Sequence, residues 1–194
     1  MSKSKFNTQS LVLAALMTAF VILFQLLGTF TAFFGPFSTA VALVPIVIGA
    51  AMCGSWCGGW LGLVFGIVVL LSGGANLFLA YEIPGTIITV LLKGALCGLA
   101  AGFTYRLFVR LRLNKYLCVL IAALVCPMVN TGVFLLGCAV FFLKHAAPIA
   151  AQLGMSGSGM EIFFALAGAN FIFEILMNIV LSPVMVRILN IKKK

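Results

Sequence analysis

The stretch PGTIITVLLKGALCGLAAGFTYRL, residues 84–107, decides the fold class of this chain. It is long enough to cross a membrane as a helix, which takes about 20 predominantly apolar residues. Lys93 lies in its interior, and Thr86, Thr89 and Lys93 share one helical face. An ionisable residue at that depth is costly, so it indicates a functional site by default.

The rest of the chain has the same apolar character. Hydrophobic residues make up 64% of the 194 residues, charged residues make up 8%, and the mean hydropathy is +1.28. A soluble domain has roughly 25% charged residues, so soluble, disordered and collagen-like proteins are excluded. The apolar runs lack the alternation of barrel strands, and we therefore predict an all-α integral membrane protein.

The apolar runs leave room for about six spans of about 20 residues each. The predicted fold is a six-transmembrane-helix bundle that forms one membrane domain over residues 1–194. The second and third runs are short for a span. The predicted helices are residues 9–30, 38–53, 58–73, 84–107, 116–142 and 161–189.

Basic residues are distributed unevenly and predict the orientation. They precede the first span, separate the fourth from the fifth, and follow the last, so with six spans they share one side of the membrane. The positive-inside rule makes that side, and both termini, cytoplasmic. The net charge of +9 then predicts contact with anionic headgroups of the lipid bilayer, not with nucleic acid.

Small residues recur at every fourth position in several spans, which in lipid favours close helix packing. The row Gly94, Gly98 and Gly102 predicts packing inside the bundle. The pair Ala15 and Ala19 is compatible with internal packing and with an outward face that docks a partner protein.

Polar residues of the last three spans are predicted to meet at one depth. Lys93, Asn130 and Glu174 lie at similar distances from the outer ends of their spans, and Asn170 lies one turn from Glu174. One interpretation is an internal ion pair with asparagine hydrogen bonds that fix helix register. The others are a site for a small organic solute and a proton or ion relay.

The outer connections are unusually apolar. The first contains Phe33, Phe34 and Phe37, and the second, residues 74–83, contains Phe78. We expect both to fold over the bundle as a lid, above a mostly apolar pocket of the kind that binds small organic molecules. The polar residues expected to contact substrate in the second connection are Asn76, Tyr81 and Glu82.

Motifs of enzymes and metal sites are missing from the sequence. It contains no H-E-x-x-H, G-x-S-x-G or P-loop motif and no aspartate. The six cysteines and the single histidine, His145, do not have zinc-ligand spacing. We therefore expect no catalytic residue, no metal and no cofactor.

Several segments taken in order resemble a known family. They are Ala15 with Ala19, ALVPIVIGA (42–50), GLVFG (62–66), Leu92-Lys93-Gly94, Asn130-Thr131-Gly132, and Asn170 with Glu174 ahead of Leu181-Ser182-Pro183. Together they resemble the substrate-binding S components of energy-coupling factor (ECF) vitamin transporters, and Lys93, Asn130, Asn170 and Glu174 most resemble the pantothenate type.

The resemblance implies an ABC-type importer subunit in the plasma membrane of a prokaryote. Such a subunit captures a vitamin or related micronutrient near the outer face, in a pocket lined by spans four to six and gated by residues 31–37 and 74–83. Ala15 and Ala19 would dock a transmembrane coupling protein, and two ATPase subunits would power import. A ligand carboxylate would pair with Lys93. The alternatives are a stand-alone solute transporter and a membrane scaffold without ligand.

Overall fold

The computed structural model describes residues 8–31, 41–157 and 159–191, and within these ranges the chain is helical, with no strand. The π-helical and 3₁₀ turns are labelled η2 and η3. The elements are α1 (Thr8–Thr31), α3 (Leu43–Cys53), α4 (Ser55–Leu71), α5 (Asn76–Leu79), α6 (Ile83–Arg110), α7 (Lys115–Gly137), η2 (Cys138–Phe142), η3 (Leu143–His145), α8 (Ala146–Gln152) and α9 (Met160–Ile191).

Each predicted span corresponds to a helix, and four stretches in the described part are long and apolar enough to cross a membrane: Thr8–Thr29, Ile83–Arg110, Lys115–Gln152 and Met160–Asn190. The helices α3 and α4 are apolar but shorter. The chain is therefore a multi-pass, all-α membrane protein.

Two predicted spans have different bounds in the structure. The second span was expected from residue 38, but α3 begins at Leu43, and residues 38–40 lie outside the described ranges. The third was expected over 58–73, but α4 spans Ser55–Leu71. A single residue, Gly54, separates the two helices, because its φ of 108° is a conformation that only glycine adopts without strain.

The outer connections contain helices that the hydropathy pattern did not predict. The connection between α4 and α6 includes the short helix α5, and the one between α7 and α9 includes α8. Ile149 and Ala150 of α8 are buried against Phe142 and Phe163 in a small apolar cluster. The connection between α7 and α9 is therefore packed against the bundle.

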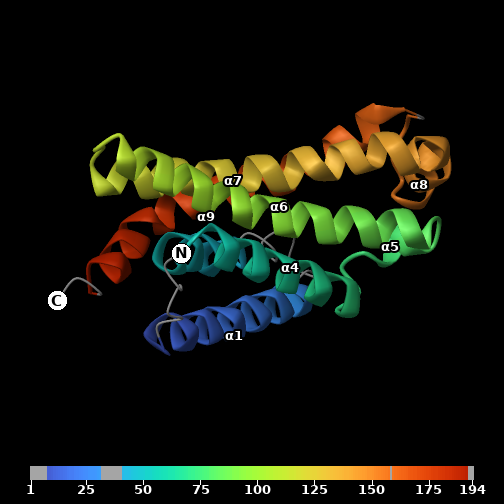
Figure 1. The fold of residues 1–194 in the computed structure, drawn as a ribbon. Helices are drawn as coiled ribbons and strands as arrows, with labels where there is room; N and C mark the ends of the chain where they lie inside the picture. The colour runs from blue at the N-terminus through green and yellow to red at the C-terminus, as the bar shows by residue number, and fades with distance from the viewer. Residues whose placement is uncertain (1–7, 32–40, 158, 192–194) are drawn as a thin grey trace, which may run out of the picture.

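Glycines bring α4 and α6 together along most of their length, and α7 then packs on α6 and α9 on α7. A methyl group on Gly62 would collide with the carbonyl of Gly94, and one on Gly98 with the carbonyl of Gly58. The internal packing predicted for the glycine row of the fourth span is thus what the structure shows. Figure 1 shows α1 along one long side of this group, where it packs mainly on α3 and α4.

Most of the basic residues in the described part of the chain lie at one end of the bundle: Arg106, Arg110, Arg112, Lys115 and Arg187. The start of α1, the turn between α6 and α7 and the end of α9 lie together there, whereas α5 and α8 lie at the opposite end (Figure 1). Lys115 Nζ donates a hydrogen bond to Asn190 Oδ1 at 2.8 Å and ties α7 to α9. The two ends of the molecule therefore differ in charge, as expected for a protein with a fixed orientation in a membrane.

Candidate functional site

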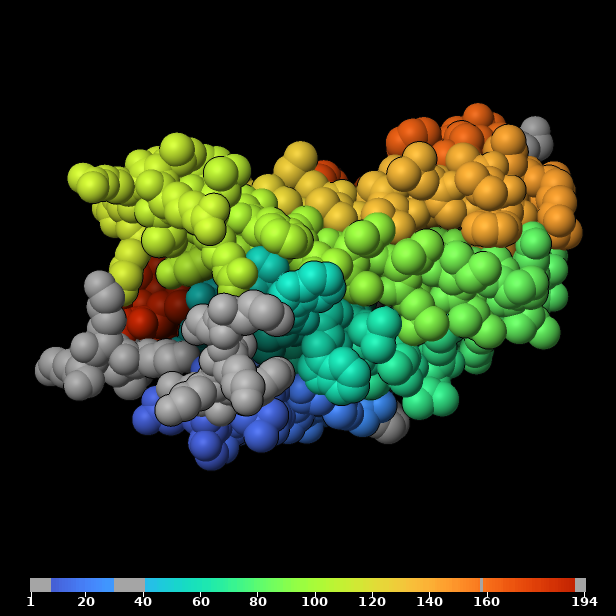
Figure 2. Space-filling model, in the orientation of Figure 1, coloured from blue at the N-terminus to red at the C-terminus, as the bar shows by residue number. Residues whose placement is uncertain are grey.

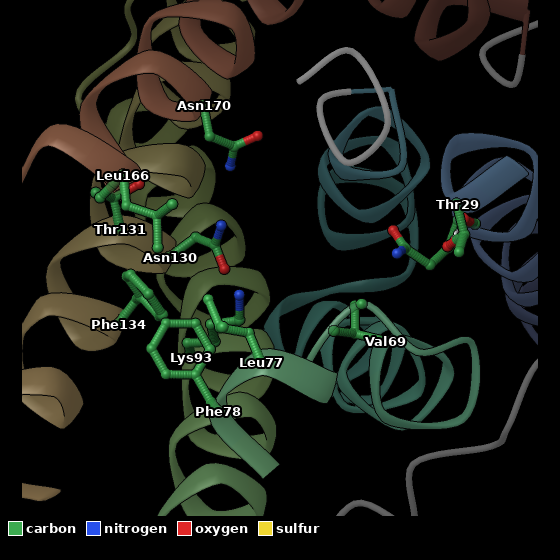
Figure 3. A pocket seen from close by; sticks show the side chains of 13 residues that line it. Thr29, Val69, Leu77, Phe78, Lys93, Asn130, Thr131, Phe134, Leu166 and Asn170 are labelled. Carbon is green, nitrogen blue, oxygen red and sulfur yellow. Dashed lines mark hydrogen bonds between the residues drawn. The ribbon is translucent and has the colours of Figure 1, made fainter. Parts of the chain in front are cut away.

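A cavity of ≈ 340 Å³ lies between α1 and α4 on one side and α6, α7 and α9 on the other, next to α5. Figure 3 shows the side chains of Lys93, Asn130 and Asn170 pointing toward this space, with Thr29 and Val69 across from them. The polar residues that line it are Gln25, Thr29, Lys93, Asn130, Thr131 and Asn170. Apolar side chains complete the lining: Val69, Leu77, Phe78, Phe134, Leu166 and Ala167.

A buried carboxylate holds two of these polar groups in place. Glu174 on α9 is fully buried and accepts hydrogen bonds from Asn130 Nδ2, at 3.2 Å to Oε1 and 3.3 Å to Oε2, and from Asn170 Nδ2, at 2.7 Å to Oε1. One turn further on, Asn178 Nδ2 donates to the Glu174 carbonyl at 2.8 Å. Glu174 therefore orients the two amides that face the cavity and ties α7 to α9.

The orientation of Asn130 has a chemical consequence. Its amide nitrogen is used by Glu174, and Oδ1 is buried without a hydrogen-bond partner in the described part of the chain. A buried acceptor left unpaired is costly. Because Asn130 lines the cavity, a solute that carries a hydroxyl or N–H group would satisfy this oxygen.

Lys93 supplies the positive charge of the site. Its Nζ lies 5.3 Å from the centroid of the Phe134 ring, a cation–π arrangement. The carboxylate of Glu174 also attracts it. An ammonium has three donors, so Lys93 can bind an anionic group of a solute while its charge remains over the ring.

Aromatic rings close the cavity on the α5 side. Phe78, which lines the cavity, packs edge-on against Phe134, at 5.4 Å between ring centroids, and against Phe142, at 5.0 Å. Its ring centroid also lies 6.4 Å from that of Phe163 on α9. The connection that carries Phe78 is thus held onto the helices that line the site.

Other residues predicted for the site lie elsewhere. Asn76 is exposed, Tyr81 Oη donates a hydrogen bond to Gln152 Oε1 at 3.1 Å, and Glu82 pairs with Lys144 at 3.4 Å. These three residues do not line the cavity, and their role in substrate binding stays a prediction. Phe33, Phe34 and Phe37 of the first predicted gating loop lie outside the described ranges.

The small-residue pair of α1 points away from the bundle. Ala15 and Ala19 are exposed, as are Val12 and Leu16 beside them. In Figure 2 α1, in blue, forms one long edge of the molecule. Ala15 and Ala19 therefore do not pack inside the bundle in this structure, and their docking of a partner protein stays a prediction.

Sequence reasoning missed the residues that α1 contributes to the cavity. Gln25 is 2% exposed, and its Oε1 has no hydrogen-bond partner among the described residues. The available signal was the same one that singled out Lys93, since a lone amide in an apolar span is also expensive. The polar residues predicted to meet came from the last three spans, and Gln25 lies in the first.

Metal ligation finds no support in the described part of the chain. No group of three His, Cys, Asp or Glu side chains is close enough there to hold an ion. The six cysteines are free thiols, and four of them are buried. The polar cavity is therefore the feature that we interpret as the functional site.

Comparison with known proteins gives one match. A family model described as "ECF transporter, substrate-specific component" matches residues 9–189, nearly the whole chain. Neither the curated proteins nor the solved structures contain a match.

Proposed function

Since the chain belongs to the ECF transporter substrate-specific component family, we propose that the cavity between α1, α4, α6, α7 and α9 is its substrate site. The family consists of transporter components and is not a class of enzymes. In this role the protein binds a small organic solute and delivers it inward with an ATP-driven partner module.

The observation that supports this proposal most is that the buried carboxylate of Glu174 binds two residues of the cavity wall. Glu174 accepts hydrogen bonds from both asparagines, and both asparagines line the cavity together with Lys93. A few oriented polar groups in an otherwise apolar cavity are typical of small-molecule sites. A network that served helix packing alone would not need to line a cavity.

The polar groups of the cavity wall indicate which chemical groups the solute carries. Lys93 favours a carboxylate, and Asn130 Oδ1 favours a hydroxyl or amide N–H group. A vitamin or related micronutrient with both groups fits, and pantothenate, which has a carboxylate, an amide and two hydroxyl groups, is our first candidate.

The orientation follows from the charged end of the bundle. The end with Arg106, Arg110 and Lys115 is placed in the cytoplasm by the positive-inside rule, with α3 and α4 crossing the membrane as the remaining two of six spans. The cavity is lined by residues of the α5 connection, at the opposite end, and would therefore fill from outside. The exposed Ala15 and Ala19 would dock the transmembrane coupling protein, which works with two ATPase subunits in a prokaryotic plasma membrane.

Thermal unfolding of the purified protein tests the proposal directly. A solute present at one hundred times its dissociation constant adds about 2.7 kcal/mol to the stability of the folded state. We expect one member of a panel of water-soluble vitamins and precursors to raise the Tm, and Asn170→Ala to abolish most of that shift. No shift across the panel would contradict the proposal and favour a scaffold.

A further inference from the structure

The wall of the cavity formed by α1 contains a second buried, unsatisfied acceptor. Gln25 is 2% exposed and lines the cavity, and its Oε1 has no hydrogen-bond partner among the described residues. An amide oxygen in that condition is costly in an apolar environment. Because Gln25 lines the cavity, a molecule bound there can supply the missing hydrogen-bond donor.

Neighbouring groups on α1 do not fill that need. Thr29 Oγ1 lies 3.0 Å from the backbone carbonyl of Gln25 and 3.1 Å from Ser72 Oγ, so its hydroxyl is already engaged inside the protein. Those contacts fix the end of α1 against the end of α4. They also hold the backbone of Gln25 in position while leaving its side-chain oxygen unpaired.

The two unpaired acceptors come from opposite walls. Asn130 belongs to α7, whereas Gln25 belongs to α1, whose Thr29 lies across the cavity from Asn130 in Figure 3. Both acceptors require donors, and Lys93 requires an anion. The cavity therefore suits an elongated solute with an anionic end and donors that reach the far wall.

We infer that Gln25 forms a second polar subsite, on the wall opposite Lys93 and Asn130, which accepts a hydrogen bond from a hydroxyl group of the solute. The inference rests on the proposed function, because it assigns one end of the same solute. Its consequence is that the bound solute connects α1, which packs mainly on α3 and α4, to α6 and α7. Occupancy of the site is thereby linked to the helix whose outer face carries Ala15 and Ala19.

The test uses the variant Gln25→Met, which keeps the length of the side chain and removes the acceptor. The probes are pantothenate and its analogue with both hydroxyl groups replaced by hydrogen, each titrated calorimetrically into the full-length purified protein. We expect Gln25→Met to bind pantothenate about tenfold more weakly, equivalent to about 1.4 kcal/mol. It should bind the analogue as the wild type does, since the analogue cannot donate to Gln25.

Three controls complete the experiment. Gln9→Met makes the same change at an exposed position of α1 and should leave both affinities unchanged. Lys93→Met should weaken both probes equally, because both carry the carboxylate. The Tm of Gln25→Met without ligand should equal or exceed that of the wild type, because an unsatisfied buried acceptor is removed.

The outcomes are distinguishable. If Gln25→Met binds pantothenate like the wild type while Lys93→Met does not, the subsite is wrong and the proposed function stands. The subsite would also be wrong if Gln25→Met had a lower Tm than the wild type without ligand and lost the same affinity for both probes. Gln25 would then be a packing residue. If the wild type binds neither probe, the subsite and the substrate candidate both fail.

Discussion

A carboxylate can be fully buried in an apolar bundle only if its oxygens are satisfied, and Glu174 shows how this protein achieves it. Two asparagine amides donate to its oxygens at 2.7–3.3 Å, and Lys93 attracts its charge. Removing one member of a buried polar network leaves the others unpaired, which costs more than the bond itself contributes. The network therefore contributes to the stability of the bundle and holds the residues of the proposed site in position.

The substitution Glu174→Gln separates charge from shape. It places an amide where two amide donors converge, so one of the three groups loses its acceptor. We expect the free energy of unfolding to fall by about 1.5–3 kcal/mol, the usual contribution of hydrogen bonds to charged groups, as measured by thermal unfolding in detergent. Glu161→Gln, at an exposed position near the start of the same helix, should change it little. Equal Tm values for the two variants would contradict this role of Glu174.

The charge of Lys93 can be tested with a matched pair of ligands. Lys93→Met should weaken pantothenate binding about ten- to hundredfold, as expected for the loss of hydrogen bonds between charged groups. Binding of the neutral primary amide of pantothenate should change much less, because it has no carboxylate to lose. Titration calorimetry measures the affinities of both ligands. If Lys93→Met lost the same affinity for the acid and for the amide, Lys93 would not be the partner of the carboxylate.

At the scale of elements, the glycine rows determine which helices can approach closely. The carbonyl groups of α4 and α6 lie where side chains would have to be, at Gly58 and Gly62 on one helix and at Gly94 and Gly98 on the other. In lipid this contact replaces the hydrophobic force that drives helices together in water. The pair α4–α6 therefore fixes the position of Lys93 relative to the wall formed by α1 and α4.

A single methyl group should reveal the importance of that contact. Gly62→Ala would push against the Gly94 carbonyl, and we expect a loss of roughly 1–3 kcal/mol, typical of overpacking. Gly168→Ala, on α9, meets nothing within 4 Å and should be neutral or stabilising. Thermal unfolding compares the two variants. A Gly62→Ala protein as stable as the Gly168→Ala protein would mean that α4 and α6 can separate without cost.

For the whole molecule, the helix α1 has two different faces. The outer face of α1 exposes Ala15 and Ala19, and its inner face brings Gln25 and Thr29 to the cavity. Apolar side chains cover much of the molecular surface, including Trp56 and Trp60 on α4. A surface of this kind is compatible with lipid on most sides and a partner helix on one.

Transport assays should separate docking from binding. Ala15→Leu and Ala19→Leu should block uptake in cells that contain the ATP-driven module, because the larger side chain prevents close helix approach, while solute binding by the purified variants stays within about twofold of the wild type. Ala147→Leu, at an exposed position of α8, should affect neither. Normal uptake by both α1 variants would contradict the docking face, and uptake without any partner would indicate a stand-alone transporter.

The sequence by itself determined the fold class and most of the helices. Runs such as 84–107 are too long and too apolar for any structure but a membrane helix, and glycines at every fourth position indicated a close helix contact. It also indicated that Lys93, Asn130, Asn170 and Glu174 belong together, because buried polar groups in lipid require one another.

Only the tertiary structure decided which of these residues face the cavity. Glu174 lies behind the asparagines that it orients, and Asn76, Tyr81 and Glu82 do not line the cavity, since these facts depend on how α5 and α9 pack. The contribution of α1 was hidden for the same reason. Gln25 and Lys93 are far apart in the chain, and the cavity that joins them exists only because α4 holds α1 on one side and α6 on the other. Helical periodicity describes one helix at a time, whereas a binding site depends on the relative placement of several.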